Sequence, residues 1–334
     1  MKILNYKEVK LVLSFQNALN WISEYFTYKA KGNIIEPDRN IYEFQKGSYS
    51  YVGSAFLKLP YHTILGTKIL SFNPKYGGKA NLSSIRSVIN LFDYESHDVL
   101  ALMDGRFILY MRTAATLALF LNTYKELFHN SLEIGILGAG QMLYFTIGFL
   151  KLLYPNSILK IYSPHAAMKR RHWIGRIASE FDVDLHIVSK ELTVDSEIVI
   201  LQTNEMKKCV LDNVSPKTRL VAGIGSISPN YIGEIGENVY SNAKLIIFDD
   251  KNKVILEHGQ LKRILENKDI ETLNIEKYHE RKRTENEIYH VFRSVGLNSQ
   301  DIFFAYKVYA ISQESNIGIK IQELNNFHLE EVFG

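Results

Sequence analysis

The spacing of apolar residues divides the chain into two parts with different rhythms. In residues 8–29 apolar positions recur every three or four residues, from Val9 through Leu13 to Phe26, which predicts one amphipathic helix. Short runs rich in β-branched and aromatic residues follow, separated by turn pairs such as Asp104-Gly105. We expect strands at 48–57, 63–72, 87–93 and 99–103. Together these runs predict an α+β domain with a mostly antiparallel sheet.

From residue 113 onward, predicted strands alternate with helices. A helical stretch over 113–128 leads into an apolar strand at 132–137, a glycine turn and a helix that reaches about Leu153. Further strands are expected at 158–162, 184–188, 198–202, 220–224 and 245–249. Strands separated by crossover segments predict a parallel, doubly wound sheet. Helical spacing returns at 285–292 and 299–314, and we expect this C-terminal part to return to the first domain.

Composition excludes several classes of protein. The 334 residues carry 39 basic and 36 acidic side chains, and this balance does not favour a nucleic-acid binder, which usually has a concentrated basic face. A single cysteine, Cys209, excludes a disulfide framework and a cysteine-rich zinc site. Charged residues (Lys7, Glu8, Lys10) stand where a signal peptide has its apolar core, and no apolar run is long enough to span a membrane. We therefore expect a cytoplasmic protein without a metal, membrane or nucleic-acid partner.

A glycine turn joins the predicted strand 132–137 to the next helix. Gly138 permits a tight turn, and Gly140 lets a phosphate group approach the backbone. The start of the helix then offers free N–H groups and a positive dipole to phosphates. In this context we interpret the pair as a dinucleotide-binding turn, with a plain tight turn as the alternative. Leu143 occupies the third position, where glycine or alanine normally allows the helix to pack closely on the strand.

The end of the following strand bears on which nicotinamide cofactor would bind. A carboxylate at this point would accept a hydrogen bond from the ribose 2′-hydroxyl of NAD(H), but this sequence has Ser163. Lys169, Arg170 and Arg171 follow, and their charges would attract a 2′-phosphate. We therefore favour NADP(H) over NAD(H), with the alternative that these cations only line a solvated helix face.

Four short segments carry a resemblance to a known family. They are Pro37-Asp38-Arg39, Gly66-Thr67-Lys68, Arg112-Thr113-Ala114-Ala115 and the stretch from Ser294-Val295-Gly296 to Asp301. With the glycine turn between the third and the fourth, their order and spacing resemble the ornithine cyclodeaminase/mu-crystallin family over nearly the whole chain. Within that family, residues 85–95 look most like the N-(2-amino-2-carboxyethyl)-glutamate dehydrogenases, which release 2,3-diaminopropionate for siderophore synthesis.

The resemblance implies a fold, a domain division and an assembly. The fold class is α/β, with a doubly wound (Rossmann) dinucleotide-binding domain over residues 115–299. Residues 1–114 and 300–334 would form an α+β domain that binds the substrate and pairs subunits. A homodimer is implied by the family's habit of pairing through that domain.

The resemblance also implies residue roles. Arg39 and Arg112 would bind the substrate carboxylate, for which a planar guanidinium fork is well suited. Lys68 would bind substrate and act as the catalytic group, polarising the reacting centre or relaying a proton. The residues expected to contact the cofactor are Arg112, Thr113, Gly138, Ala139, Gly140, Gln141, Met142, Ser163, Arg170, Thr203, Gly225, Ser226 and Ser294.

One departure from the family pattern separates the possible activities. Cyclodeaminases carry a catalytic aspartate in a Gly-x-Asp-x-Pro loop, and this sequence has Ile227 at that position. An aliphatic side chain cannot take a proton from the substrate amine, which argues against cyclisation of ornithine. We therefore expect an NAD(P)-dependent oxidoreductase acting on the Cα–N bond of an amino acid, an N-substituted amino acid or an imino acid. The alternatives are a cyclodeaminase-type lyase and a non-catalytic, crystallin-like nucleotide-binding protein.

Overall fold

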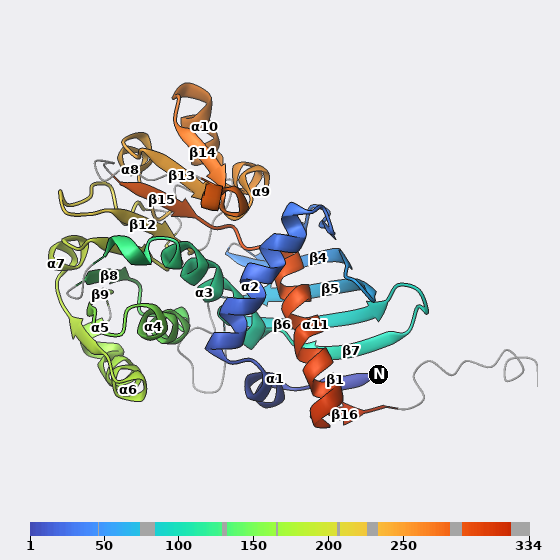
Figure 1. Ribbon diagram of the computed structural model, residues 1–334. Helices are drawn as coiled ribbons and strands as arrows, with labels where there is room; N and C mark the ends of the chain where they lie inside the picture. The colour runs from blue at the N-terminus through green and yellow to red at the C-terminus, as the bar shows by residue number, and fades with distance from the viewer. Residues whose placement is uncertain are drawn as a thin grey trace, which may run out of the picture. The chain divides into compact units, whose positions relative to one another are not determined.

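Two structural units make up the chain. The computed structural model describes residues 1–45, 47–73, 84–128, 132–164, 166–205, 208–225, 233–280 and 289–321. One unit comprises Met1–Arg112 and Leu297–Gly334, and the other comprises Thr113–Gly296 (Figure 1). These boundaries fall two and three residues before those expected from the sequence. The first lies inside helix α3 (Arg106–Asn122), which begins in one unit and ends in the other.

The first unit is built on an eight-stranded sheet. Its strands are β1 (Lys2–Leu4), β2 (Ile34–Ile35), β3 (Asn40–Gln45), β4 (Ser48–Lys58), β5 (Thr63–Phe72), β6 (Ile85–Asp93), β7 (Val99–Asp104) and β16 (Ile319–Lys320). They lie in the order β16-β1-β7-β6-β5-β4-β2, and β3 also pairs with β4. Strands β4 to β7 form an antiparallel meander, which confirms the predicted sheet, while β1 runs parallel to β7.

Three helices accompany this sheet. They are α1 (Tyr6–Val12), α2 (Phe15–Ala30) and α11 (Asn298–Ser315), and in Figure 1 α2 and α11 lie side by side. The single helix predicted over residues 8–29 is wrong, because the chain turns extended at Leu13. The Ser14 side chain then accepts a hydrogen bond from the Asn17 amide at 3.2 Å and starts α2 as its N-cap.

Two glycines allow α11 to pack closely on the sheet. A Cβ atom added at Gly53 of β4 would lie 1.9 Å from Asn298 Nδ2, and one added at Gly66 of β5 would lie 2.3 Å from the Ile302 side chain. Side chains at these two points would hold the helix away from the strands. The absence of side chains therefore brings the first turns of α11 down onto β4 and β5.

The second unit is a doubly wound parallel sheet, as predicted. Its strands are β8 (Glu133–Leu137), β9 (Ile158–Tyr162), β10 (Asp184–Ile187), β11 (Ile198–Leu201), β12 (Leu220–Gly223), β13 (Leu245–Phe248), β14 (Glu271–Asn274) and β15 (His290–Arg293). They lie in the order β10-β9-β8-β11-β12-β15-β13-β14, and every adjacent pair is parallel. The order reverses between β8 and β11, which is where such sheets bind ligands at their carboxyl edge.

The remaining helices connect these strands. They are α4 (Met142–Leu153), α5 (Ala166–Lys169), α6 (Arg171–Phe181), α7 (Lys190–Val194), α8 (Glu237–Ser241), α9 (Lys251–Glu257) and α10 (Gly259–Asn267), with 3₁₀ turns at Lys125–Leu127 and Ile275–Glu280. In the part of the chain that the structure describes, no helix is both long and apolar enough to cross a membrane.

The helix predicted over residues 285–292 is wrong where the structure describes it. Residues 281–288 lie outside the described part, and His290–Arg293 form strand β15. All four residues of β15 are buried between β12 and β13. A strand this short and buried on both faces has no alternation of apolar and polar residues, so its pattern cannot be told from that of a helix.

A close contact between backbones gives a test of the packing in the second unit. A Cβ atom at Gly135 in β8 would lie 1.9 Å from the Thr193 carbonyl oxygen, whereas one at Gly175 in α6 would meet nothing within 4 Å. We expect Gly135→Ala to destabilise the protein by about 1–3 kcal/mol through overpacking. Gly175→Ala should stabilise it by up to about 1 kcal/mol, since alanine favours helix. Thermal unfolding of both variants measures the difference, and equal midpoints would contradict the close approach.

Candidate functional site

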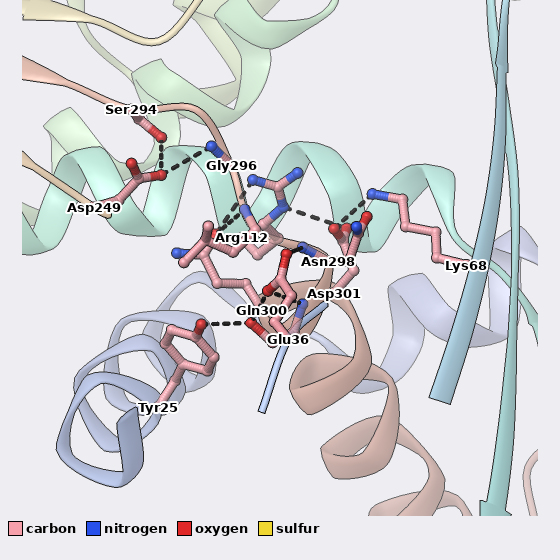
Figure 2. A network of polar contacts seen from close by, with 12 residues as sticks. Tyr25, Glu36, Lys68, Arg112, Asp249, Ser294, Gly296, Asn298, Gln300 and Asp301 are labelled. Atoms are coloured by element: carbon pink, nitrogen blue, oxygen red, sulfur yellow. Dashed lines mark hydrogen bonds and ion pairs between the residues drawn. The ribbon is translucent and has the colours of Figure 1, made fainter. Parts of the chain in front are cut away.

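A buried cluster of charged side chains lies in the first unit. Lys68 comes from β5, Arg112 from α3 and Asp301 from the first turn of α11 (Figure 2). Lys68 Nζ donates to Asp301 Oδ2 at 2.5 Å, and Arg112 Nε donates to Asp301 Oδ1 at 3.3 Å. The side chains of Lys68, Arg112 and Asp301 are 5%, 6% and 0% exposed. One carboxylate therefore holds two cations out of water.

Strand alternation and close packing bring these residues together. Lys68 lies on the face of β5 that α11 covers, between Gly66 and Leu70. Its register partner on β4 is Gly53, over which the first residue of α11 packs. Arg112 also donates to Gln300 Oε1 at 3.3 Å. The start of α11 thus supplies the acceptors for both cations.

Burial changes the acid–base behaviour of Lys68. Desolvation lowers the pKa of its ammonium group to about 8, although the Asp301 carboxylate acts in the opposite direction. The charges of Arg112 and Arg39 lower it as well, so Arg39 lies near enough for its charge to act on Lys68. The Arg39 guanidinium lies over the Tyr51 ring, 5.3 Å from its centroid. Lys68 can therefore both hold and release a proton near neutral pH.

The net charge of the cluster indicates what it can bind. Three of the four side chains Arg39, Lys68, Arg112 and Asp301 are cationic and one is anionic. Arg39 is partly exposed, whereas the other three are buried. An additional anionic group would reduce the electrostatic cost of this arrangement, and a carboxylate matches the planar fork of a guanidinium.

The glycine turn of the second unit has the conformation that the sequence predicts. Gly138 adopts φ +117°, and a Cβ atom there would lie 2.8 Å from the Gln202 carbonyl oxygen. Gln202 Nε2 donates to Gly138 O at 2.9 Å and fixes the turn. A Cβ atom at Gly140 would meet nothing within 4 Å, so the backbone is open there. Leu143 is fully buried, so the larger third residue packs into the core.

Arg170 is connected directly to this turn. Its guanidinium donates to the Ala139 carbonyl, while Ser163 directly follows β9. Gln141 is the N-cap residue of α4, which begins at Met142, and the first turn of α4 contains no acidic residue. The parts that the sequence assigned to phosphate binding and to the ribose 2′ position therefore meet at the carboxyl edge of β8 and β9.

A buried ion pair ties three strand ends together at the same edge of the sheet. Arg293 NH1 donates to Glu234 Oε1 at 2.7 Å, and both side chains are almost fully buried. Glu234 also accepts hydrogen bonds from the Thr203 amide and hydroxyl, both at 2.9 Å, and from the Gly225 amide at 2.8 Å. The segments that follow β11 and β12 are thereby fixed to β15.

A second buried carboxylate holds Ser294. The Ser294 hydroxyl donates to Asp249 Oδ2 at 2.6 Å, and the amides of Val295 and Gly296 donate to the same carboxylate (Figure 2). Burial raises the pKa of Asp249, and these hydrogen bonds oppose that shift. The Ser294 hydroxyl proton is committed to Asp249 and its amide donates to Gly223 O, so Ser294 has only acceptor oxygens left to offer.

The structure groups the predicted residues into two sets and leaves two outside its description. Arg39, Lys68 and Arg112 gather in the first unit, and the glycine turn, Ser163 and Arg170 gather in the second, which also contains Thr113, Thr203, Gly225 and Ser294. Ser226 and Ile227 lie outside the described residues. The roles assigned to these residues stay predictions.

Several residues that organise these sets were missed in the sequence. Asp301 was visible as the last residue of a recognisable motif, and its acidic type at the start of a helix was the available signal. Glu234 and Asp249 gave no signal, because their partners are distant in sequence or are backbone amides. Burial and the Asp212 charge raise the pKa of the Cys209 thiol.

Known proteins resemble this chain along most of its length. It is 22% identical over 332 residues to alanine dehydrogenase of Archaeoglobus fulgidus. This match covers 96% of this chain and 98% of the relative. It is 23% identical to Delta(1)-pyrroline-2-carboxylate reductase of Bacillus cereus, over 77% of this chain and 80% of the relative. A solved structure of Delta(1)-pyrroline-2-carboxylate reductase of Thermococcus litoralis, in complex with NADH and L-proline, matches 96% of this chain and 100% of its own. That match has a TM-score of 0.82 at 21% identity.

The family itself is identified by a match that spans both units. The sequence model of the ornithine cyclodeaminase/mu-crystallin family matches residues 1–316, which include the buried cluster of the first unit and the glycine turn of the second. This chain therefore belongs to the ornithine cyclodeaminase/mu-crystallin family.

Proposed function

We propose that this protein is an NAD(P)-dependent oxidoreductase that acts on the Cα–N bond of an amino acid or imino acid. The observation that carries the proposal is the Lys68–Asp301–Arg112 cluster, where a lysine with a pKa of about 8 lies beside a guanidinium. The relatives include an alanine dehydrogenase and pyrroline-2-carboxylate reductases, whose names give an amino acid and a cyclic imino acid as substrates.

A nicotinamide dinucleotide fits the carboxyl edge of the second unit. Gly138 leaves no room for a side chain, and the space at Gly140 is open to a pyrophosphate. We assign the phosphates to the turn from Gly138 to Met142, and further contacts to Thr203, Gly225 and the Ser294 backbone. When bound, this cofactor supplies or accepts the hydride.

The first unit supplies the substrate-binding and proton-transfer groups. Arg112 and Arg39 bind the substrate carboxylate through their guanidinium groups. Lys68 donates a proton to the imine nitrogen when the substrate is reduced and accepts it when the amine is oxidised. Asp301 orients the Lys68 ammonium and keeps its pKa from falling further. A secondary or cyclic imine and a free imine are equally compatible with these roles.

Two points concern the activity more closely: whether the protein could be a cyclodeaminase, and which members of the family it resembles most. Ile227 cannot serve as the acid or base that ornithine cyclisation needs. The likeness of residues 85–95 to the N-(2-amino-2-carboxyethyl)-glutamate dehydrogenases stays a prediction.

A screen with purified protein tests the proposed function. We expect the absorbance of reduced nicotinamide to fall in step with substrate when NADPH or NADH is mixed with Δ1-pyrroline-2-carboxylate or with pyruvate plus ammonium. Ornithine should give neither proline nor ammonia. Cofactor binding without turnover of any keto acid–amine pair or cyclic imino acid would instead identify a non-catalytic binding protein. Proline formed from ornithine would identify a lyase.

The role of Arg112 in binding the substrate carboxylate predicts a loss of catalytic efficiency when its side chain is changed. Arg112→Lys keeps the charge but loses the planar fork, and a lost charged hydrogen bond of about 1.5–3 kcal/mol corresponds to a roughly ten- to hundred-fold lower kcat/KM. Arg106→Lys is the matched control, because Arg106 lies on the same helix but pairs with Asp104 at the partly exposed start. Arg106→Lys should change neither kcat/KM nor the affinity for reduced cofactor.

The pH dependence identifies the proton donor. Since reduction needs protonated Lys68, kcat/KM for reduction should fall as pH rises through about 8, and oxidation should show the opposite slope. Lys68→Ala should lower kcat more than it raises KM and should abolish this limb. A Lys68→Ala enzyme within about twofold of the parent, with the same pH profile, would show that the site is misplaced.

Cofactor preference is the finer part of the proposal. Ser163 offers no carboxylate to repel a 2′-phosphate, and Arg170 is held at the glycine turn by the Ala139 carbonyl. We expect NADPH to bind more tightly than NADH, and Ser163→Asp to reverse the order because a carboxylate accepts from a 2′-hydroxyl. Titration of nicotinamide fluorescence measures both affinities. A preference of the parent protein for NADH of about tenfold, or 1.4 kcal/mol, would contradict the assignment.

A homodimer formed through the first unit is supported by its open sheet face. Val52, Ile69 and Val88 lie in register on three neighbouring strands, and these residues are 36%, 50% and 43% exposed. Adjacent exposed apolar side chains of this kind are typical of subunit contacts. A monomer in sedimentation equilibrium at micromolar concentration would contradict this assembly.

A further inference from the structure

Glu36 links the loop that carries Arg39 to the helix that carries Asp301. Its Oε1 accepts a hydrogen bond from the Asn298 amide at 3.0 Å, and its Oε2 accepts one from the Ser299 amide at 2.9 Å (Figure 2). The Ser299 hydroxyl also donates to Oε2 and lies 2.7 Å from the Tyr25 hydroxyl. The two amides are the first of α11, so the Glu36 carboxylate satisfies donors that have no partner within the helix.

Glu36 lies at a break in strand pairing, next to the part of the sheet that carries Lys68. Strands β2 and β3 both pair with β4, with Ile35 opposite Phe56 and Asn40 opposite Val52. Four residues, 36–39, therefore lie opposite three, 53–55, and the chain leaves the sheet between them. Gly53 is the residue over which Asn298 packs, and it is the register partner of Lys68.

The connection from Glu36 to Arg39 is short and stiff. Pro37 has a fixed φ, and a proline also restricts the residue before it to an extended conformation. On the other side of Arg39, the chain enters β3 at Asn40. The Arg39 side chain is therefore placed by an anchor on each side, and the N-terminal anchor is the bond of Glu36 to α11.

We propose that Glu36 is a positioning residue for substrate binding, which holds Arg39 in register with Arg112 and Lys68 by fixing the 36–39 loop to the start of α11. The proposal rests on the proposed function, in which Arg39 and Arg112 bind the substrate carboxylate. Glu36 touches no reacting atom. It acts through Arg39, whose charge already acts on Lys68.

The test compares two carboxylates that both bind α11. Glu36→Gln replaces one acceptor oxygen by an NH₂ group that would face an amide N–H or the Ser299 hydroxyl. We expect KM for Δ1-pyrroline-2-carboxylate, or for pyruvate with ammonium, to rise about tenfold, which is the effect of about 1.4 kcal/mol. The kcat and the affinity for reduced cofactor should stay within about twofold.

Glu24→Gln is the matched control. Glu24 lies on α2 and pairs at 2.6 Å with Lys307, which is more than two turns further along α11 than Ser299. It should lower the unfolding midpoint without changing KM. If Glu24→Gln raises KM as much as Glu36→Gln does, the effect is one of general helix docking and the proposal is overturned.

A double-mutant cycle with Arg39→Ala separates positioning from general stability. If Glu36 acts through Arg39, Glu36→Gln should change KM less than about twofold once Arg39 is absent. If the rise in KM of the double variant equals the product of the rises in the two single variants, the proposal is overturned. Ser299→Ala removes only one of the three donors to Glu36, so it should raise KM less than Glu36→Gln does. This rise should also disappear once Arg39 is absent, so the variant keeps the test available if Glu36→Gln folds poorly.

The outcomes also distinguish this proposal from the proposed function. If Arg39→Ala raises KM and Glu36→Gln does not, the carboxylate role of Arg39 stands and the positioning role of Glu36 is wrong. If Arg39→Ala leaves KM unchanged in an active enzyme, the role of Arg39 in the proposed function is wrong and the role of Glu36 fails with it.

Discussion

The burial of Lys68 beside Arg112 is the constraint on which the first unit depends. Two cations removed from water cost several kcal/mol unless a carboxylate compensates them, and Asp301 is the carboxylate that contacts both. Asp301 is 233 residues from Lys68 in sequence, so the pair forms only when the chain has passed through the second unit and returned as α11. Gly53 and Gly66 make that return close enough for the ion pair.

The sequence predicted those parts of the fold whose side chains alternate or recur regularly. Strands β4 to β7 are half buried, so their period of two is visible in the residues. Strand β15 is buried on both faces and gave no such period. The break between α1 and α2 depends on one serine that caps a helix, a local hydrogen bond that competes with a continuous apolar pattern.

The candidate site was predictable to the extent that its residues stand in a motif. Arg39, Lys68 and Arg112 were found through their family order, and the structure brings their charges together. The sequence assigned no role to Asp301 or Glu36, because the groups that each carboxylate contacts lie far away along the chain. A carboxylate that accepts backbone amides leaves no residue pattern, since any residue except proline supplies an amide.

The acids near the predicted site residues are bonded to the chain itself. Glu36 is bonded to the first amides of α11, Glu234 to Thr203, Gly225 and Arg293, and Asp249 to the amides that precede Leu297. Each of these carboxylates therefore accepts hydrogen bonds from other parts of the chain, and Asp301 accepts them from two cations. In the function that we propose, a substrate carboxylate adds a negative charge beside Arg112, where Lys68 can exchange a proton.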